Sequence, residues 1–280
     1  MTLQLLEQVG ARCSENITKT YSTSFSLASR LLGRRERRGI YAIYGFVRLA
    51  DEIVDTLSNV SKRELLEEFK TETANAISRR VSLNPALHSF QWCVNTYRIE
   101  PELVLAFFRS MEADLTAKSH TEESYREYIY GSAEVVGLMC LRVFADRDEG
   151  IYTENVSGAR ALGAAFQKVN FLRDLRHDFE ALGRCYFPSI APNNFTADDK
   201  RRIEADIEQD FAVAREHLSK LPRAARLGVT LAYVYYNALF KRLKLLSPEQ
   251  VRSSVRVRVP DSEKLFLLVR TCCQYCMGVI

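Results

Sequence analysis

Apolar residues recur with a period close to 3.6 along almost the entire chain, and few glycine or proline residues interrupt them. This periodicity is typical of amphipathic helices, each of which buries one stripe of its surface. With 12 Gly and 7 Pro among 280 residues, the pattern predicts an all-α protein. The helices are expected at residues 3–15, 22–32, 36–57, 61–79, 84–97, 102–117, 122–145, 153–181, 197–219, 222–245 and 262–276.

The strongest interruption of this pattern is the segment from Arg184 to Pro188, which follows one of the predicted helices directly. Further turns are expected at Ser247-Pro248 and Val259-Pro260, because proline rarely continues a helix. A chain of this length with 47% apolar residues can bury one large core. We therefore expect a single domain over residues 1–280, although two tightly fused halves would also fit.

The net charge of +4 is too small to indicate a nucleic-acid partner. The N-terminus lacks the basic start and long apolar core of a signal peptide, and no uninterrupted apolar run reaches the ~18–20 residues that span a bilayer. Seven scattered cysteines are typical of reduced thiols. These features predict a cytoplasmic protein, and the basic run from Arg34 to Arg38 could in addition meet anionic lipid headgroups at a membrane surface.

Two acidic clusters of the same shape lie about 120 residues apart. Asp51 and Asp55 form the first, and Asp174 and Asp178 form the second. A spacing of four places both carboxylates of each cluster on one helix face, one turn apart, where they repel each other. Two such pairs in otherwise apolar helices indicate a cation between them, and carboxylate oxygens suit Mg²⁺ that bridges to substrate phosphates.

The neighbours of these acids decide between a ligand site and an ordinary solvated face. An isolated pair of this kind is usually a solvated face. Here Arg48 shares the face of the first pair, and Gln167 and Asn170 share that of the second, while the adjacent stripes are apolar. Because no Gly-rich phosphate loop is present, a diphosphate would be held by metal and basic side chains.

Five segments together resemble the squalene/phytoene synthase family of head-to-head prenyl synthases. Tyr21 to Phe25 is similar to the family's opening segment, and Tyr41 to Asp55 is similar to its first metal motif. Tyr128 to Met139 resembles its central substrate helix. Gln167 to Asp178, followed by Gly183 to Pro188, resembles its second metal motif and the segment after it. Their common order over most of the chain makes the resemblance specific, and bacterial phytoene synthases are the most similar members.

The resemblance implies an all-α isoprenoid-synthase fold, in which helices surround a central active-site cavity. It implies that two allylic diphosphates bind through Mg²⁺, with Mn²⁺ as an alternative ion. One diphosphate leaves and gives an allylic cation, and the double bond of the second substrate attacks it. The resulting cyclopropylcarbinyl diphosphate ionises again and rearranges to the hydrocarbon product.

The resemblance also assigns roles to individual residues of this sequence. The expected metal ligands are Asp51, Asp55, Asn170, Asp174 and Asp178. The expected catalytic residues are these four aspartates together with Arg48, Tyr128 and Tyr235. The expected substrate-binding residues are Tyr21, Ser24, Phe25, Arg48, Val136, Gly137, Leu138, Gln167, Asn170, Arg173, Arg256 and Lys264. Tyr236 is a weaker candidate than Tyr235 for stabilising a cation, and His177 is expected at the surface.

Three positions depart from the family's commoner pattern. The first motif reads DExxD instead of DDxxD, so that Glu52 provides a longer carboxylate. Tyr21 stands where some members have His, and Thr23 stands where some have Lys. One contact to a diphosphate could therefore be lost or replaced.

Several functions remain open at this point. The first is condensation of two geranylgeranyl diphosphates to phytoene without NADPH, which the DEIVD motif and the segment from Gly131 to Leu138 favour. The alternative is a squalene or dehydrosqualene synthase that uses farnesyl diphosphate. A non-catalytic family member would be expected to have lost acidic residues, yet all four paired aspartates are present. Charge and motifs do not support a nucleic-acid binder.

Overall fold

The computed structural model describes residues 3–57, 60–188, 190, 194–253 and 256–278 of the chain. The regular elements of this part are helices, accompanied by one isolated bridge between Ser119 and Cys185, so the predicted all-α fold is confirmed. In chain order they are α1 (Leu3–Tyr21), α2 (Thr23–Ser29), α3 (Arg34–Asp55), α4 (Lys62–Arg79), α5 (Pro85–Tyr97), α6 (Pro101–Asp114), α7 (Glu122–Ile129), the π-helix η1 (Tyr130–Glu134), α8 (Val135–Ala145), α9 (Glu149–Leu182), α10 (Ala197–Leu218), α11 (Arg223–Lys244), α12 (Pro248–Ser253) and α13 (Asp261–Cys276).

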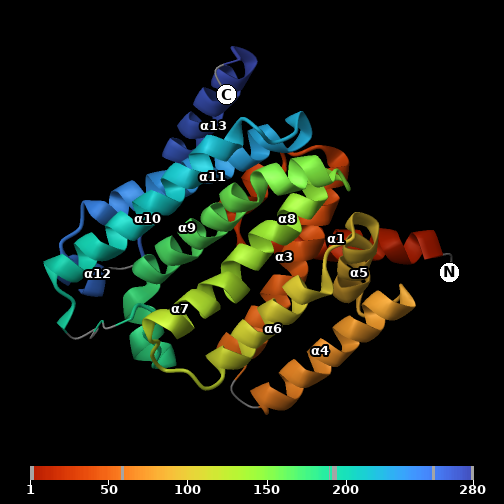
Figure 1. Ribbon diagram of the computed structural model, residues 1–280, viewed down its shortest axis with the longest axis horizontal. Helices are drawn as coiled ribbons and strands as arrows, with labels where there is room; N and C mark the ends of the chain where they lie inside the picture. The colour runs from red at the N-terminus through yellow and green to blue at the C-terminus, as the bar shows by residue number, and fades with distance from the viewer. Residues whose placement is uncertain (1–2, 58–59, 189, 191–193, 254–255, 279–280) are drawn as a thin grey trace.

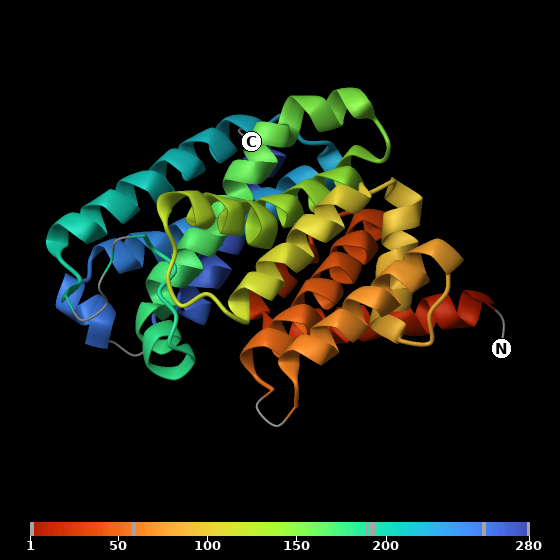
Figure 2. The same cartoon turned by 60° about the horizontal axis from the view of Figure 1, so that its bottom comes forward.

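The helices form a slanted array in which α10, α9, α8 and α6 lie next to one another, with α3 behind α8 and α6 (Figure 1). Turned by 60°, the molecule shows α1 and the N-terminus at one end and α12 at the other (Figure 2). The long helices α3 and α9 therefore run through the middle of the molecule. This arrangement brings the two acidic motifs, which lie on these two helices, into the same central region.

The boundaries of α9 follow from capping residues at both ends. The Asp148 side chain accepts a hydrogen bond from the Ile151 amide, 3.0 Å away, and so starts the helix. Gly183 ends it in the left-handed region, at φ +67°, where glycine has no steric penalty. The following Arg184 amide donates to the Asp178 carbonyl at 2.9 Å. This turn reverses the chain directly after the second acidic motif and brings Arg184 to Asp55 of the first motif.

Most of the predicted helices are present, but three details differ. The predicted helix 122–145 contains the π-helix η1 between α7 and α8. The predicted helix 3–15 continues to Tyr21. The turn expected at Ser247-Pro248 is followed by the short helix α12, which the periodicity of so few residues could not indicate. Proline fits there because the first turn of a helix needs no amide donor.

Two apolar cores meet at the centre of the molecule. The first, built around Phe46, joins α3 to α4, α5, α6 and α8, and the Phe46 ring stacks on Phe90 with centroids 3.9 Å apart. The second joins α7, α9, α10 and α11. Helices α8 and α9 connect the two halves at close range, because a Cβ atom added to Gly137 would lie 2.3 Å from the Ala159 carbonyl oxygen. Glycine at this position permits the backbone contact.

One helical stretch, Glu122–Ala145, is long and apolar enough to cross a membrane. However, 67% of the residues in the most apolar part of this stretch are buried inside the protein. The stretch consists of α7, η1 and α8, and it contacts α6 and α9. Its apolar composition is thus accounted for by packing within the fold.

Candidate active site

The first acidic motif occupies the C-terminal half of α3. The Asp51 side chain is 33% exposed. The Arg48 Nη1 atom lies 3.9 Å from the Asp51 Oδ2 atom. Arg48 also pairs with Glu52 one turn further along the helix. The Arg48 guanidinium lies 4.3 Å from the centroid of the Tyr21 ring, a cation–π contact that fixes its orientation. The motif thus presents an oriented cation beside its acids.

The second acidic motif occupies the corresponding part of α9. Asp174 accepts hydrogen bonds from Arg173, with its Oδ1 atom 2.9 Å from Nε and its Oδ2 atom 2.5 Å from Nη2. The Arg256 Nε atom lies 3.0 Å from the Asp174 Oδ1 atom, so a second guanidinium approaches from the segment before α13. Asn170 and Asp178 lie one turn to either side of Asp174 on the same face. Two arginines therefore converge on one carboxylate, as in a site for an anion.

The electrostatics of the acids show that the two motifs face each other. Burial raises the pKa of Asp51 to about 8, and the Asp55 charge adds to this effect. Burial likewise raises the pKa of Asp178 to about 7, and the charges of Asp174 and Asp55 add to it. Because Asp55 is on α3 and Asp178 is on α9, their repulsion acts between the motifs. The site is consequently short of positive charge.

Asp174 behaves differently from its neighbours. Burial acts to raise its pKa, but hydrogen bonds from Arg173 and the charges of Arg173 and Arg256 outweigh burial and hold that pKa below its usual range. Asp174 is therefore a carboxylate that Arg173 and Arg256 both bind directly. An incoming anion would compete with Asp174 for these two arginines.

The donor set fits Mg²⁺ held jointly with a substrate. In the part of the chain that the structure describes, no three His, Cys, Asp or Glu side chains gather closely enough to hold a metal by themselves. Mg²⁺ is usually bound by one or two carboxylates together with waters and substrate phosphates. The facing motifs match this requirement, because each contains one carboxyl group with a raised pKa, Asp51 and Asp178, and a cation between the motifs would relieve the repulsion.

A buried ionic network behind the first motif was not predicted from the sequence. The Arg184 Nη1 atom lies 2.7 Å from the Asp55 Oδ1 atom and 3.7 Å from the Asp114 Oδ1 atom. Asp114 also accepts hydrogen bonds from the hydroxyls of Tyr128 at 2.7 Å and Tyr186 at 3.1 Å. Arg184 thus holds Asp55 in place and compensates the charge of Asp114. In the sequence, this network could have been indicated by Asp114, an acidic residue on the apolar face of α6.

The two motifs border a cavity of about 430 Å³. Along α3 its lining changes from Ile40 and Ile43 to Arg48 and Asp51, and along α9 it changes from apolar residues to Asn170 and beyond. The cavity therefore has a polar end, where the motifs lie, and a mostly apolar remainder that also includes Asn155 and His217. Its volume is within the range of ligand pockets. Such a space suits a molecule with an anionic head and an apolar tail.

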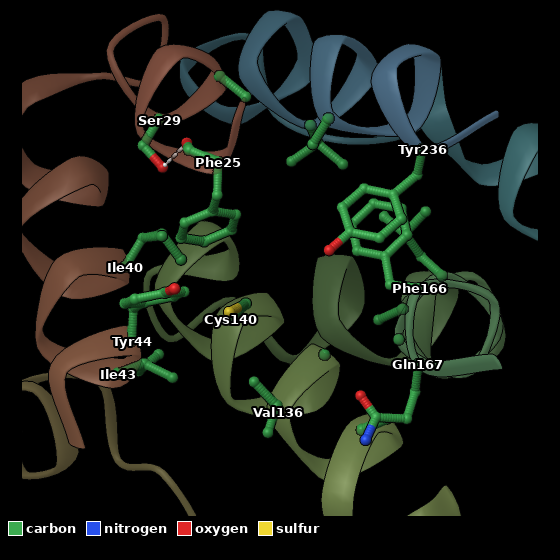
Figure 3. A pocket seen from close by; sticks show the side chains of 18 of the residues that line it. Phe25, Ser29, Ile40, Ile43, Tyr44, Val136, Cys140, Phe166, Gln167 and Tyr236 are labelled. Atoms are coloured by element: carbon green, nitrogen blue, oxygen red, sulfur yellow. Dashed lines mark hydrogen bonds between the residues drawn. The ribbon is translucent and has the colours of Figure 1, made fainter. Parts of the chain in front are cut away.

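Aromatic side chains narrow the apolar part of the cavity, as the close view shows (Figure 3). The rings of Phe25 and Tyr44 stack on one side with centroids 5.0 Å apart. The rings of Phe166 and Tyr236 stack on the other side at 3.8 Å. Between them Val136 from α8 forms part of the wall. Aromatic faces carry negative potential, so these rings can stabilise a cation in the cavity.

Most residues expected to bind substrate do line this cavity. They are Tyr21, Phe25, Arg48, Val136, Gly137, Gln167, Asn170, Arg173 and Arg256, and Asp51 lines it as well. Asp55, Asp174 and Asp178 lie beside its polar end through the contacts described above. His177 is exposed, as expected.

The tyrosines are placed differently from the prediction. Tyr236 lines the cavity, and its hydroxyl donates to the Asn170 Oδ1 atom at 3.5 Å. Tyr235 is 3% exposed, points away from the cavity and donates to the Lys264 carbonyl at 3.0 Å. Tyr128 is buried behind the motifs, where it donates to Asp114. Of these two tyrosines of α11, Tyr236 is therefore the one that lines the cavity.

Three other expected binding residues lie outside the cavity. Leu138 is 6% exposed and packs in the core around Phe46, because it lies on the opposite side of α8 from the cavity-lining residues. Ser24 is beside the cavity-lining Ser22 and Phe25 but does not line the cavity itself. The Lys264 Nζ atom lies 3.1 Å from the Asp261 Oδ1 atom and 3.4 Å from a threonine hydroxyl of α2. Lys264 therefore contacts other protein groups and does not line the cavity.

Comparison with known proteins adds to this geometry. A family model described as squalene/phytoene synthase matches residues 18–263. The chain is 29% identical over 212 residues to the phytoene synthase of Pseudescherichia vulneris, covering 70% of this chain and 67% of that protein. It is 24% identical to the 4,4′-diapophytoene synthase of Staphylococcus haemolyticus, covering 86% and 90%. A crystal structure of a dehydrosqualene synthase superposes with a TM-score of 0.82 at 22% identity, covering 98% and 99%, which confirms the expected isoprenoid-synthase fold.

Proposed function

Because the chain belongs to the squalene/phytoene synthase family, whose members join two prenyl diphosphates head to head, we propose that it condenses two geranylgeranyl diphosphates to phytoene. The observation that carries this proposal is the pair of acidic motifs facing each other at the polar end of an apolar cavity. The diphosphates bind at that end, and the prenyl tails extend along α3 and α9 into the apolar part. No reductant takes part in this reaction.

The reaction begins with loss of one diphosphate, which takes the electron pair of the breaking C–O bond and leaves an allylic cation. The double bond of the second substrate attacks this cation, and loss of a proton closes a cyclopropane ring that still carries one diphosphate. The second diphosphate then leaves, and the cation rearranges and loses a proton to give the hydrocarbon. When Mg²⁺ is bound, the acids of the two facing motifs would hold it, and it would supply positive charge that stabilises the departing diphosphates.

The residues of the chain divide between binding and stabilisation. Arg48, Arg173 and Arg256 offer planar donor groups that match diphosphate oxygens. The stacked pair of Phe166 and Tyr236 lies next to the polar end, where the cation forms. The apolar lining excludes water, which would otherwise capture the cation.

A product assay tests the proposal directly. We expect the purified protein, supplied with geranylgeranyl diphosphate and Mg²⁺, to form a C40 hydrocarbon at a rate that NADPH does not change. The measurement is the mass of the extracted hydrocarbon, with farnesyl diphosphate supplied in parallel. Conversion of farnesyl diphosphate alone to a C30 product would replace the proposal by a squalene or dehydrosqualene synthase, and no product from either substrate would leave a non-catalytic family member.

Replacing Arg48 by lysine tests the role of its planar donor group. Lysine keeps the charge but loses the fork that can bind two phosphate oxygens and the stacking on Tyr21. We expect kcat/KM to fall about 5- to 150-fold. This corresponds to a loss of about 1–3 kcal/mol of transition-state stabilisation, which is the strength of charge-assisted hydrogen bonds. The rate is measured at fixed Mg²⁺.

The matched control is Arg201→Lys, since the Arg201 side chain is 70% exposed on α10 and pairs with Asp198 in solvent. That variant should keep the wild-type rate. An equally unchanged rate for Arg48→Lys would mean that Arg48 is an ordinary helix-surface charge.

A further inference from the structure

The end of the cavity that lies farthest from the acidic motifs contains polar atoms. Along α9, Asn155 is the first residue that lines the cavity and Arg173 is the last. Asn155 precedes Asn170 by fifteen residues of this helix, which corresponds to about 22 Å at 1.5 Å per residue. His217 of α10 lines the cavity together with Asn155. We call these two side chains the distal pair.

Each member of the distal pair has a buried polar atom without a hydrogen-bond partner among the described residues. Asn155 is 1% exposed, and its Nδ2 atom donates to the Ile151 carbonyl at 2.9 Å. Because a carbonyl can only accept, this bond fixes the orientation of the amide and leaves Oδ1 as the unpartnered acceptor. The His217 Nε2 atom lies 3.0 Å from the hydroxyl of the exposed Ser157, whereas its Nδ1 atom is buried and unpartnered.

Gly158 brings the two members of the pair close together. A Cβ atom added to Gly158 would lie 2.4 Å from the His217 Cβ atom, so the histidine side chain rests directly on this glycine. Asn155 precedes Gly158 by three residues and therefore lies on the same face of α9, about one turn away. Helix α10 packs along α9 (Figure 1). The two unpartnered atoms thus belong to one small area of the cavity wall.

The chemistry of these two atoms selects a hydroxyl group. A hydrocarbon tail would leave both atoms buried without a hydrogen bond, which costs free energy. A hydroxyl group can donate to the Asn155 oxygen and accept from His217 Nδ1–H, in the tautomer whose Nε2 atom accepts from Ser157. An anion fits poorly, because it would meet the Asn155 oxygen, and the arginines of the described cavity lining are all at the polar end.

We propose that the distal pair is a hydroxyl-binding subsite, which accepts a prenyl diphosphate that carries a hydroxyl group at the far end of its chain. With an unsubstituted chain, a water molecule takes the same place. This assignment rests on the proposed function, since the diphosphate must occupy the polar end for the chain to reach the distal pair. Between the distal pair and Gln167, the α9 residues that line the cavity are apolar: Gly158, Ala159, Leu162, Gly163 and Phe166.

The distance of the subsite from the acidic motifs agrees with the reaction. The allylic cation forms at the polar end, where a hydroxyl group would capture it. About 22 Å of helix separates Asn155 from Asn170, so a hydroxyl group held by the distal pair stays away from the cation. Head-to-head joining leaves the far end of each chain at an end of the product. The hydroxyl group would therefore pass through the reaction unchanged.

Binding of substrate analogues to the full chain tests the proposal. Thiolodiphosphate analogues ionise too slowly to turn over, so calorimetry in the presence of Mg²⁺ measures their dissociation constants directly. The geranylgeranyl analogue is compared with the same compound carrying a hydroxyl group on its terminal carbon. We define the hydroxyl preference as the dissociation constant of the first divided by that of the second. This preference should fall at least about fivefold in Asn155→Leu, because the hydroxyl group then loses its acceptor.

A second variant and a matched control accompany Asn155→Leu. His217→Phe keeps a planar ring on Gly158 but has no ring nitrogen, so the hydroxyl preference should fall in this variant as well. Asn75→Leu is the control, because Asn75 is exposed on α4, a helix that contributes no residue to the described cavity lining. It should keep the wild-type preference. Circular dichroism shows whether each variant is folded.

The wild type alone provides a test that does not depend on the folding of a variant. A hydroxyl group placed in the middle of the chain would lie among the apolar residues of α9 and find no partner. We expect this analogue to bind at least about fivefold more weakly than the one hydroxylated at the terminal carbon. Equal binding of the two analogues would overturn the proposal, as would an unchanged hydroxyl preference in both folded variants.

Two further outcomes separate the subsite from its substrate. A hydroxyl preference seen with farnesyl analogues and not with geranylgeranyl analogues would support the subsite while replacing the chain length of the proposed function. A terminal hydroxyl group that weakens binding to the wild type, together with tighter binding of the unsubstituted analogue to Asn155→Leu, would leave water as the occupant and overturn the hydroxylated substrate. Because binding is measured without turnover, a protein that forms no product can still show the preference.

Discussion

Replacing Asp51 or Asp174 by alanine is expected to abolish turnover while leaving the helical fold intact. Each aspartate lies at the polar end of the cavity in one of the two facing motifs. Loss of a carboxylate that helps to hold Mg²⁺ on a departing diphosphate should cost several kcal/mol of transition-state stabilisation, or at least about a thousandfold in rate. The measurement is product formation at saturating Mg²⁺.

The two variants should differ in stability, which tests the electrostatic description of the site. The pKa of Asp51 is raised to about 8 by burial and by Asp55, so its removal relieves repulsion and should leave the melting temperature unchanged or higher. Asp174 has a lowered pKa because Arg173 and Arg256 bind it, so its removal separates these pairs and should lower the melting temperature slightly.

The control for both variants is Asp198→Ala, since the Asp198 side chain is 84% exposed on α10. It should match the wild type in rate and melting temperature. Addition of Mg²⁺ with inorganic diphosphate should stabilise the wild type and the control but not the two active-site variants. Rates near the wild type in Asp51→Ala and Asp174→Ala would remove the metal assignment.

The helical fold and the pairing of acids within each motif could be predicted because both follow from short-range periodicity, whereas the facing of the two motifs was implied by the family resemblance. The spacing of Asp51 from Asp55, and of Asp174 from Asp178, fixes which side chains share a face. The apolar stripes beside them fix which face is buried. That the two polar faces meet across the cavity depends on α8, which packs against both α3 and α9.

Residues that depend on which helices are neighbours could not be assigned in this way. Tyr235 and Tyr236 are adjacent in sequence and point about 100° apart on α11, so either could have faced the cavity. Packing of α13 on α11 buries Tyr235 and leaves Tyr236 to the cavity. Leu138 was likewise assigned by its place in a motif, although it faces the core.

Asp114 and the π-helix η1 illustrate a second limit. A lone acid on an apolar helix face gives no indication of its partner, which here is Arg184, 70 residues later in the chain. The π-helix changes hydrogen bonding over five residues, Tyr130–Glu134, without changing the overall helical pattern. Both features depend on contacts between distant segments. The single domain, the cytoplasmic location and the absence of NADPH stay predictions.

Removing the Arg184 side chain is expected to impair both stability and activity. Its guanidinium is the only cation within 4 Å of Asp114 among the described residues, and it also bonds Asp55 and the Val54 carbonyl. Arg184→Ala leaves the Asp114 carboxylate buried without a cation, which typically costs about 3–5 kcal/mol. Turnover should fall as well, because Asp55 loses the group that orients it. Urea unfolding and product formation measure the two effects.

A second substitution separates these two effects. Asp114→Asn removes the buried charge, so Arg184→Ala/Asp114→Asn should regain much of the stability that Arg184→Ala loses, yet remain poorly active because Asp55 is still unsupported. Recovery of activity together with stability would show that Arg184 acts only in folding.

The pH dependence of the single variant provides an independent check. Burial raises the pKa of Asp114 to about 6, while the Arg184 charge opposes that rise. Removing Arg184 should therefore raise this pKa further. A carboxyl group whose pKa is higher in the folded than in the unfolded state favours folding increasingly as the pH falls through the folded pKa. The stability difference between Arg184→Ala and the wild type should consequently narrow from pH 8 to pH 5.5, and a constant difference would mean that the loss comes from packing and not from the unpaired charge.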